Sequence, residues 1–472
     1  MNRALPVLRR HAGVWVLTAG LLSICTPRAL AEQVHVDCAP GNPSGSEFTS
    51  IQAAIVYLGT LPVVGDWDRV LLRSDCTENV SITRSHVWIT PEFDCPWSGC
   101  PNTPTRITAA NPAAPVITVD GPHDVTLVHV VLSGGVNGLS ILSGGWVSAY
   151  GVVAEKNVLD ASGGLNSGNG FLLDVGSYLS LGEGGAVNNA GYGLILGQGA
   201  SASLFGSQSW LQNVPLTISG NGHGGLRIDR AQFVVWAGVT VDGNKGWGLL
   251  LLGADATFGS CCGSAPTSVR NNSSGGAFVS EGSEASFWGQ TAFQNNGPYG
   301  VYLDAGSSAV FDPLGTDLVI EGHTEVGVDV TTHGHAEFRG PVVRNNGTAM
   351  KPWSAGVRVD GGSQAYFGND SAGTPAQVTD NSGPGILVDL GSELEVPSAV
   401  IEGNSKEAVR IYHHSTAFLG RNAQVQTNGY GALRCDLTSL VVAERLTKSP
   451  ACLVVERATE PRPPRPDPFS LP

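Results

Sequence analysis

Apolar and polar positions alternate in a pattern that recurs about every 23 residues along most of the chain. Each repeat begins at a small residue, and the residues one and three positions later are apolar. The small residues are Gly138, Gly170, Gly193, Gly225, Gly248, Gly276, Gly300, Gly327, Gly356, Gly385, Ala408 and Ala432. Alternation over so short a segment is typical of a strand with one buried face. We therefore predict a strand after each small residue.

Two further strands are predicted in each repeat. The inward pair of the second strand is Ala and then Phe in five successive repeats, and the third strand ends in an apolar residue. The pairs are Ala256 and Phe258, Ala285 and Phe287, Ala309 and Phe311, Ala336 and Phe338, and Ala365 and Phe367; the third-strand residues are Val269, Phe293, Ile320, Val343 and Val378. The pattern predicts five phenyl rings stacked along one core.

An asparagine stands three residues after the third-strand apolar residue in most repeats, and His323 takes its place once. The predicted ladder is Asn166, Asn189, Asn221, Asn244, Asn272, Asn296, Asn346, Asn381, Asn404 and Asn428. Asn tolerates left-handed backbone, and its amide can bond the equivalent turn of the next repeat.

One short helix is predicted over residues 48–59, ahead of the repeats. Thr49 and Gln52 form a capping-box pattern, and Gly59 can end the helix. Its apolar face consists of Ile51, Ala54, Ile55 and Leu58. Such a helix can cover the open end of a stack of strands.

The N-terminal segments resemble a known superfamily. They are Phe48-Thr49-Ser50-Ile51-Gln52-Ala53-Ala54-Ile55, Arg69-Val70-Leu71-Leu72 and Thr77-Glu78-Asn79-Val80-Ser81-Ile82. They resemble the cap and first coils of the pectin lyase-like right-handed parallel β-helix superfamily. The resemblance implies an all-β, right-handed parallel β-helix with a short N-terminal capping helix. Leucine-rich repeats also carry an Asn ladder, but they lack the second strand with its small-then-large pair.

The domain organisation follows from these segments. We expect a signal peptide at 1–31, a single β-helix domain at 32–445 with regular coils at 138–442, and a Pro-rich extension at 446–472. The basic start, the apolar segment 12–24 and the small-x-small site before Glu32 are typical of a signal peptide. A lipid anchor at Cys25 is the alternative. The protein is thus expected to be secreted, extracellular or periplasmic, without a transmembrane segment.

The net negative charge of the mature chain disfavours some classes of partner. Removing residues 1–31 removes four of 26 Lys and Arg and none of 40 Asp and Glu, so the mature charge is 22 − 40 = −18. A protein this acidic is a poor candidate for nucleic acid or anionic membranes, and polyuronates would be repelled unless a cation intervened.

Eight cysteines remain after removal of the signal, which favours disulfides in an exported protein. Proximity in the sequence favours Cys38 with Cys76, Cys95 with Cys100 and Cys435 with Cys452. The adjacent Cys261 and Cys262 are not assigned. No Cys and His spacing is typical of a zinc site.

The catalytic motifs of known β-helix enzymes are absent, and no family catalytic residue can be transferred. Gly222-His223-Gly224 and Arg227-Ile228-Asp229 look like polygalacturonase motifs but stand too close together. Catalytic candidates from the residues alone are Asp304, Asp329, Asp360 and Asp389, on outer positions or turns of successive coils. Asp360 and Asp389 are also candidate calcium ligands. Asx turns are the alternative explanation for these aspartates.

Outward positions two residues after the anchors form a strip that includes apolar and aromatic side chains. Ligand-binding candidates on or near it are Phe278, Tyr302, Arg358, His333 and His335. Coverage of the strip by other parts of the chain is the alternative. The primary hypothesis is a non-catalytic β-helix that binds a polysaccharide or cell-surface glycan. The alternatives are a polysaccharide lyase or glycoside hydrolase, with calcium as a candidate cofactor, and a purely structural or adhesion protein.

Overall fold

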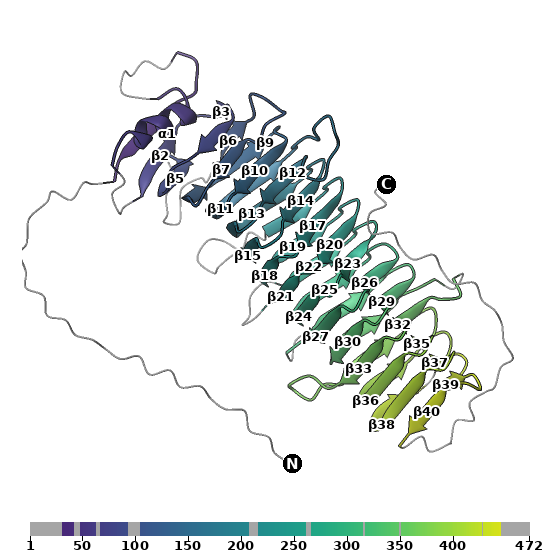
Figure 1. The fold of residues 1–472 in the computed structure, drawn as a ribbon. Helices are drawn as coiled ribbons and strands as arrows, with labels where there is room; N and C mark the ends of the chain where they lie inside the picture. Colours follow the sequence, from purple (N-terminus) through teal and green to yellow (C-terminus); the bar gives the residue numbers. More distant parts are fainter. Residues whose placement is uncertain are drawn as a thin grey trace, which may run out of the picture.

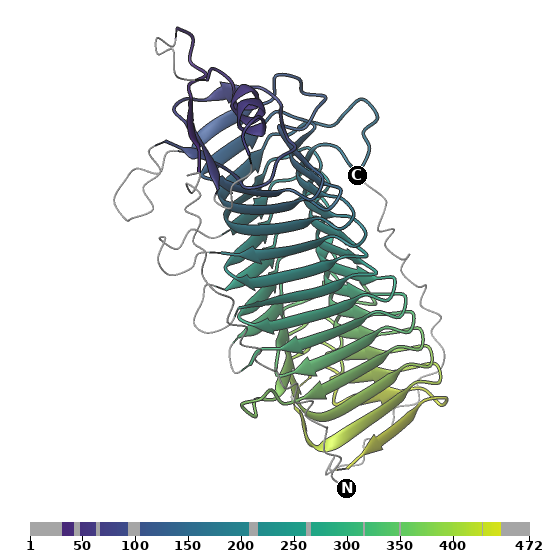
Figure 2. The same ribbon diagram turned by 60° about the vertical axis from the view of Figure 1, so that its left-hand side comes forward.

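The computed structural model describes residues 31–41, 48–62, 67–92, 104–206, 216–260, 266–314, 317–348, 351–426 and 428–444. These residues wind into a long stack of coils with a single helix, α1 (Ile51–Gly59), at the N-terminal end (Figure 1 and Figure 2). All pairings between the named strands are parallel. The chain is a right-handed parallel β-helix, as predicted.

The coils have three faces, and the first face is a 14-stranded sheet. Its strands follow the anchor residues of the repeats. They are β4 (Val80–Ile82), β7 (Ile117–Asp120), β10 (Asn137–Leu142), β12 (Asn169–Leu173), β14 (Tyr192–Leu196), β17 (Gly224–Asp229), β20 (Trp247–Leu252), β23 (Gly275–Ser280), β26 (Tyr299–Leu303), β29 (Val326–Val330), β32 (Ala355–Val359), β35 (Ile386–Val388), β37 (Val409–Ile411) and β39 (Leu433–Cys435).

The second face is one row of a 26-stranded sheet. It contains β1 (Gln33–Val36), β2 (Asp68–Leu72), β5 (Val87–Pro91), β8 (Asp124–Val128), β11 (Trp146–Glu155), β13 (Tyr178–Val187), β15 (Ser201–Phe205), β18 (Gln232–Ala237), β21 (Asp255–Ser260), β24 (Glu284–Gly289), β27 (Ser308–Asp312), β30 (His335–Arg339), β33 (Gln364–Gly368), β36 (Glu393–Glu402), β38 (Thr416–Val425) and β40 (Leu440–Ala443).

The third face is the other row of that sheet. Its own strands are β3 (Cys76–Thr77), β6 (Thr105–Thr108), β9 (Val130–Ser133), β16 (Leu216–Ser219), β19 (Val239–Asp242), β22 (Thr267–Arg270), β25 (Thr291–Gln294), β28 (Leu318–Glu321), β31 (Val342–Arg344) and β34 (Ala376–Thr379). The ten-residue strands β11, β13, β36 and β38 continue from the second face onto the third and so join the two rows.

One continuous apolar core fills the space between the faces. The predicted inward residues of the first face are at most 5% exposed in all twelve repeats. The five predicted phenyl rings do stack, with centroids 5.4, 5.2, 5.0 and 4.4 Å apart from Phe258 to Phe367. Phe233, one coil earlier, packs against Phe258 with centroids 5.4 Å apart and ring planes inclined by 52°.

The asparagine ladder lies at the turn between the third and first faces. Each amide oxygen accepts from the ladder residue one coil earlier, as in Asn272 to Asn296 at 2.9 Å, and each Nδ2 donates to a carbonyl of the third face. The left-handed residue is the one before the ladder position, at Asn188, Asn271, Asn295, Asn345 and Asp380 and at the glycines of other coils. The ladder Asn is thus selected for its amide.

Asn166 is not part of the ladder, and that prediction is wrong. Asn166 is exposed, whereas Asn157 is buried and donates to Asn189 at 2.7 Å. The coil contains extra residues between its ladder turn and Gly170, so the residue four positions before the anchor belongs to the insertion. The ladder therefore begins nine residues earlier in this coil (166 − 157 = 9).

Helix α1 buries the four predicted residues Ile51, Ala54, Ile55 and Leu58 against the first coils. The predicted capping box of Thr49 and Gln52 is wrong, because Ser50 is the N-cap and accepts from the Ala53 N–H. Gln52 instead bonds the backbone of Ser81 in β4. The backbone of the first coil thus binds the Gln52 side chain in place of the helix end.

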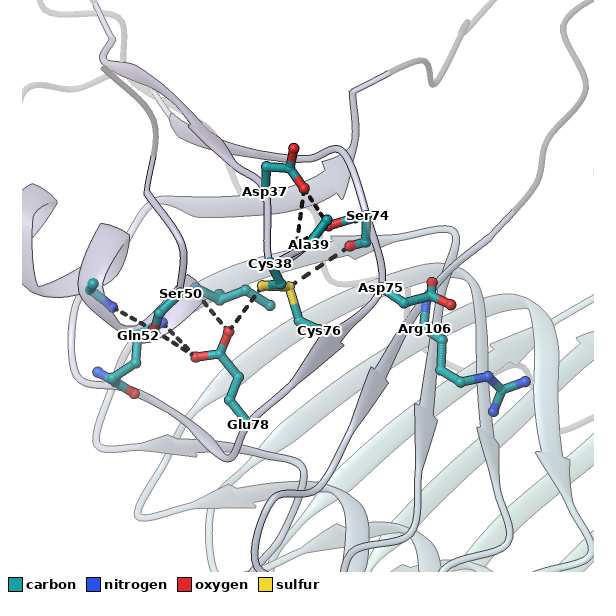
Figure 3. The surroundings of a disulfide bond; sticks show 12 residues. Asp37, Cys38, Ala39, Ser50, Gln52, Ser74, Asp75, Cys76, Glu78 and Arg106 are labelled. Carbon is teal, nitrogen blue, oxygen red and sulfur yellow. Dashed lines mark hydrogen bonds between the residues drawn. A yellow bond between two sulfur atoms is a disulfide. The ribbon is translucent and has the colours of Figure 1, made fainter. Parts of the chain in front are cut away.

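A disulfide joins Cys38 to Cys76, as predicted, and ties the turn after β1 to β3 (Figure 3). Beside it, the Glu78 carboxylate accepts from the backbone N–H of Ile51 at 2.7 Å and of Gln52 at 3.0 Å, which satisfies donors at the start of α1. Cys435 is also disulfide-bonded. The predicted signal peptide up to residue 30, Cys25, Cys95, Cys100, Cys261, Cys262, Cys452 and the extension 446–472 lie outside the described residues.

Candidate functional site

The outward strip on the first face is buried. Phe278 and Tyr302 are each 2% exposed and stack with centroids 5.3 Å apart. Trp247 and Tyr299, each one residue before an anchor, pack against them in a second apolar cluster. This burial agrees with the covered alternative and not with an open binding strip. Burial also raises the pKa values of the Tyr299 and Tyr302 hydroxyls.

Asp329 and Arg358 continue the strip as a buried ion pair. The Arg358 Nε donates to Asp329 Oδ1 at 2.7 Å, and Nη2 binds the other carboxylate oxygen. Asp329 is fully buried and Arg358 is 7% exposed. Burial raises the pKa of Asp329, and the attraction of Arg358 offsets part of that rise. Two candidates from the sequence, one catalytic and one ligand-binding, thus satisfy each other.

The other candidate aspartates occupy the turns after the first face. Asp304 accepts from the Ala305 N–H at 2.8 Å, and Asp389 accepts from the Leu390 N–H at 2.9 Å. Asp389 also contacts His413 Nδ1 at 2.5 Å. Asp360 lies one coil before Asp389, because Val359 and Val388 are in register. The backbone contacts of Asp304 and Asp389 are those of turn-forming aspartates.

The two candidate histidines are exposed and lie at the turn between the first and second faces. His333 lies in a turn between the first and second faces with a φ of 63°, and His335 is exposed at the start of β30 on the second face. The structure therefore does not bring His335 to the strip that holds Tyr302.

Potential metal ligands gather at a different place from the one predicted. Within the described ranges, three or more such side chains lie close together at Cys38, Cys76 and Glu78 (Figure 3). The two sulfurs are joined in the disulfide, which removes them as metal ligands. Asp360 and Asp389 belong to no such group among the described residues. Their role as calcium ligands stays a prediction.

His223 lines a shallow hollow at the ladder turn, together with Asn188, Gly220 and Lys245. Burial lowers its pKa, and its ring packs edge-on against Tyr192 with centroids 5.8 Å apart. The Gly222-His223-Gly224 motif thus belongs to a turn of the scaffold, as expected from its place beside Asn221.

A row of aromatic side chains on the outside of the second face was not found by sequence reasoning. We call it the aromatic row; it consists of Tyr150, Phe205, Trp236 and Trp288, on β11, β15, β18 and β24. Tyr150 is 40% and Trp236 is 49% exposed, and the other two are half-buried. These strands lie side by side along the stack (Figure 1), so the row runs parallel to its long axis.

The rings lie back over the preceding coil. A Cβ on Gly182 would stand 2.4 Å from the Phe205 ring, and one on Gly259 would stand 2.3 Å from the Trp288 ring. Both glycines are in the coil before the ring that covers them. Trp236 likewise donates from Nε1 to Ser203 Oγ of the preceding coil at 3.0 Å. The Phe205 and Trp288 rings therefore cover glycines of the preceding coil, whereas the Tyr150 and Phe205 rings are inclined to each other by 56°.

A row of small polar residues accompanies the aromatic row. We call it the hydroxyl row; it consists of Ser148, Ser180, Ser203, Thr257 and Ser286, in register on successive coils except for Val234. Each is at least partly exposed. The second face from β11 to β24 thus combines apolar ring faces with hydroxyl groups.

One signal in the sequence could have revealed the aromatic row. From β11 to β24, the residue directly after the second inward residue of the second strand is either aromatic or glycine. It is aromatic in Ala149-Tyr150, Leu204-Phe205, Val235-Trp236 and Phe287-Trp288, and glycine in Leu181-Gly182 and Phe258-Gly259. Only strand register shows that each glycine lies beneath a ring.

The described residues contain no helix that is long and apolar enough to span a membrane.

Comparison with known proteins gives no match to a family model and no match to a curated protein. Among solved structures, the chain is similar to the A-module of mannuronan C-5 epimerase AlgE4 from Azotobacter vinelandii, with 13% identity and a TM-score of 0.39 over 86% of this chain and 100% of that one. The A-module of AlgE6 from the same organism has 12% identity and a TM-score of 0.36 over 84% of this chain and 95% of that one.

The periplasmic alginate epimerase AlgG gives 13% identity and a TM-score of 0.29, over 71% of this chain and 78% of that one. Similarity at this level carries no activity over to this chain. The parallel β-helix fold rests on the strand pairing itself.

Proposed function

We propose that the protein is an exported, non-catalytic β-helix that binds a polysaccharide or cell-surface glycan along its second face. The observation that carries this proposal is the aromatic row, whose rings are partly exposed beside the hydroxyl row. Sugar rings have apolar faces and hydroxyl edges, so an aromatic face with neighbouring hydrogen-bonding groups suits them. The buried strip with Phe278 and Tyr302 has no part in this proposal.

Export is part of the proposal. The disulfide between Cys38 and Cys76 fits an oxidising compartment, where glycans of the cell surface are met.

The catalytic alternative has less support. Of its four aspartates, Asp329 is neutralised by Arg358, and Asp304 and Asp389 accept backbone hydrogen bonds in their turns. No contact among the described residues favours a pair of carboxylates acting on a substrate.

Affinity electrophoresis of the full chain in gels containing a panel of soluble polysaccharides tests the proposal. We expect at least one polysaccharide to retard the protein, and Trp236→Ala to reduce that retardation. Tyr430→Ala is the matched control, because Tyr430 is 68% exposed and lies outside the second face. Equal retardation of both variants would remove the aromatic row from consideration, and mobility unchanged by every polysaccharide would refute glycan binding.

A further inference from the structure

The charge of the second face points to the class of polysaccharide. From β11 to β24, the aromatic and hydroxyl rows and the residues in register with them contain no Asp, Glu, Lys or Arg. The remaining members are Gly182, Val234, Ala237 and Gly259; Ala237 is in register with Phe205, and Trp236 lies at the register shift between these two strands. The strip itself is uncharged, although the chain has 40 acidic and 26 basic residues.

Acidic side chains border this strip. Asp255 and Glu284 are exposed at the start of β21 and β24, and Glu183 follows Gly182 at the corner with the third face. The strip ends at β27, where Asp312 is in register with Trp288. The first arginine beyond it, Arg339, is engaged by Glu337 at 2.7 Å and Asp312 at 3.8 Å. A polyanion would meet carboxylates at the border and no unpaired cation on the strip.

We propose that the aromatic row binds a neutral polysaccharide, one whose sugars carry hydroxyls and no carboxylates. This rests on the proposed function and names its ligand class. Aromatic rings supply stacking surfaces that need no charge. Each Ser or Thr of the hydroxyl row both donates and accepts hydrogen bonds, so it bonds a sugar hydroxyl that acts as acceptor or as donor. The coils repeat every ~4.8 Å, so an extended polymer meets the same groups again along the axis.

The glycines beneath the rings set the geometry of the site. An added Cβ at Gly259 would force the Trp288 ring off the sheet. The backbone at Gly259 does not have a positive φ, so alanine is tolerated by the main chain there. Gly259→Ala therefore keeps the aromatic residue and changes only the orientation of its face. It separates stacking on a flat ring from mere hydrophobic contact.

The experiment compares neutral and anionic polymers by affinity electrophoresis and isothermal titration calorimetry of the full chain. The neutral probes are hydroxyethylcellulose, galactomannan and glucomannan; the anionic probes are alginate and polygalacturonate, each with EDTA and with Ca²⁺. We expect a neutral probe to bind, with affinity falling about tenfold in Trp288→Ala and in Gly259→Ala, the loss of one aromatic anchor. Alginate and polygalacturonate should bind at least tenfold more weakly in EDTA.

The outcomes separate the two proposals. If a polyuronate binds in EDTA as tightly as the neutral probes, and Trp288→Ala abolishes that binding, glycan binding stands and the neutral class is wrong. If no probe of either class binds, glycan binding itself fails. If a neutral probe binds equally to wild type, Trp288→Ala and Gly259→Ala, the site lies elsewhere and this inference is wrong. Thermal unfolding of each variant confirms that a loss of binding is not a loss of fold.

Discussion

At the scale of the residue, burial decides which side chains are available for function. Asp329 and Tyr302 occupy outward positions of the first face, yet Asp329 is fully buried and Tyr302 is 2% exposed. Trp236 occupies an outward position of the second face and is 49% exposed. Position relative to the anchor predicts the direction of a side chain but not its contact with solvent. Buried outward residues such as Asp329 therefore contribute to packing, and exposed ones such as Trp236 are accessible to solvent.

The ion pair of Asp329 and Arg358 leads to a stability prediction. We expect Arg358→Met to destabilise the protein by about 3–5 kcal/mol, because it leaves a buried carboxylate without its cation. Urea denaturation followed by circular dichroism measures the change.

The double variant Asp329→Leu with Arg358→Met should recover most of that loss, because it removes both buried charges. Arg339→Met is the control, since its ion pairs are partly exposed and contribute little. Similar losses in Arg358→Met and Arg339→Met would contradict a special role for the buried pair.

At the scale of the element, the asparagine ladder contains one exception. His323 stands where the other coils carry Asn; it is 1% exposed, and both of its ring nitrogens lack a hydrogen-bond partner of normal geometry in the described part of the chain. Burial lowers the pKa of His323 to about 4, although the nearby backbone of Asn296 and Phe293 raises it slightly. The histidine is therefore neutral in the folded ladder.

The buried His323 predicts that the free energy of unfolding depends on pH. The unfolded pKa of histidine is about 6.5, so the unfolded chain binds a proton between about pH 6.5 and 4 that the folded chain does not. The contribution of neutral His323 to the free energy of unfolding is complete above pH 6.5. It decreases by roughly 3 kcal/mol as the pH falls to 4.

Denaturant unfolding of wild type and His323→Asn at pH 7.5 and pH 4.5 isolates this effect. We expect the variant to lose less stability than wild type on acidification, because Asn does not titrate and can make the ladder hydrogen bonds. The other titrating groups are common to both proteins and cancel in the difference. Parallel losses in the two proteins would show that protonation of His323 is not coupled to unfolding.

At the scale of the whole molecule, each coil contacts mainly its two neighbours, so stability is local along the axis. The phenyl stack crosses five coils from Phe258 to Phe367, Phe233 packs against its first ring, and these rings link their coils through the core. Helix α1 closes the N-terminal end with four buried side chains and is held by Glu78 and the Cys38 disulfide. A defect within the stack should therefore be felt most in its own region.

Phe311→Ala tests this locality. Removing a fully buried ring should cost about 3–5 kcal/mol. Hydrogen exchange followed by mass spectrometry should show the largest loss of protection in β24, β27 and β30, and little change in β2 and β5 at the capped end. Equal loss of protection along the whole chain would mean that the stack unfolds as one unit.

The repeat pattern by itself determined the coils, their inward residues, the phenyl stack and nearly all of the ladder. It could do so because alternation and small anchors report directly on which side chains face a core. Asn166 and the Thr49 capping box were misassigned where an insertion or the backbone of a neighbouring coil changed the local partner. Such partners are not encoded by local spacing.

Only the tertiary structure decided on which face the outward side chains are exposed to solvent. Burial of Phe278 and the pairing of Asp329 with Arg358 depend on packing between coils and above the first face, which the pattern within one repeat does not contain. The aromatic row likewise exists only because parallel register places Gly182 beneath Phe205 and Gly259 beneath Trp288. The period of the sequence specifies a strand and its inner face, whereas the chemistry of the outer surface arises from residues that are a coil apart in the chain and adjacent in space.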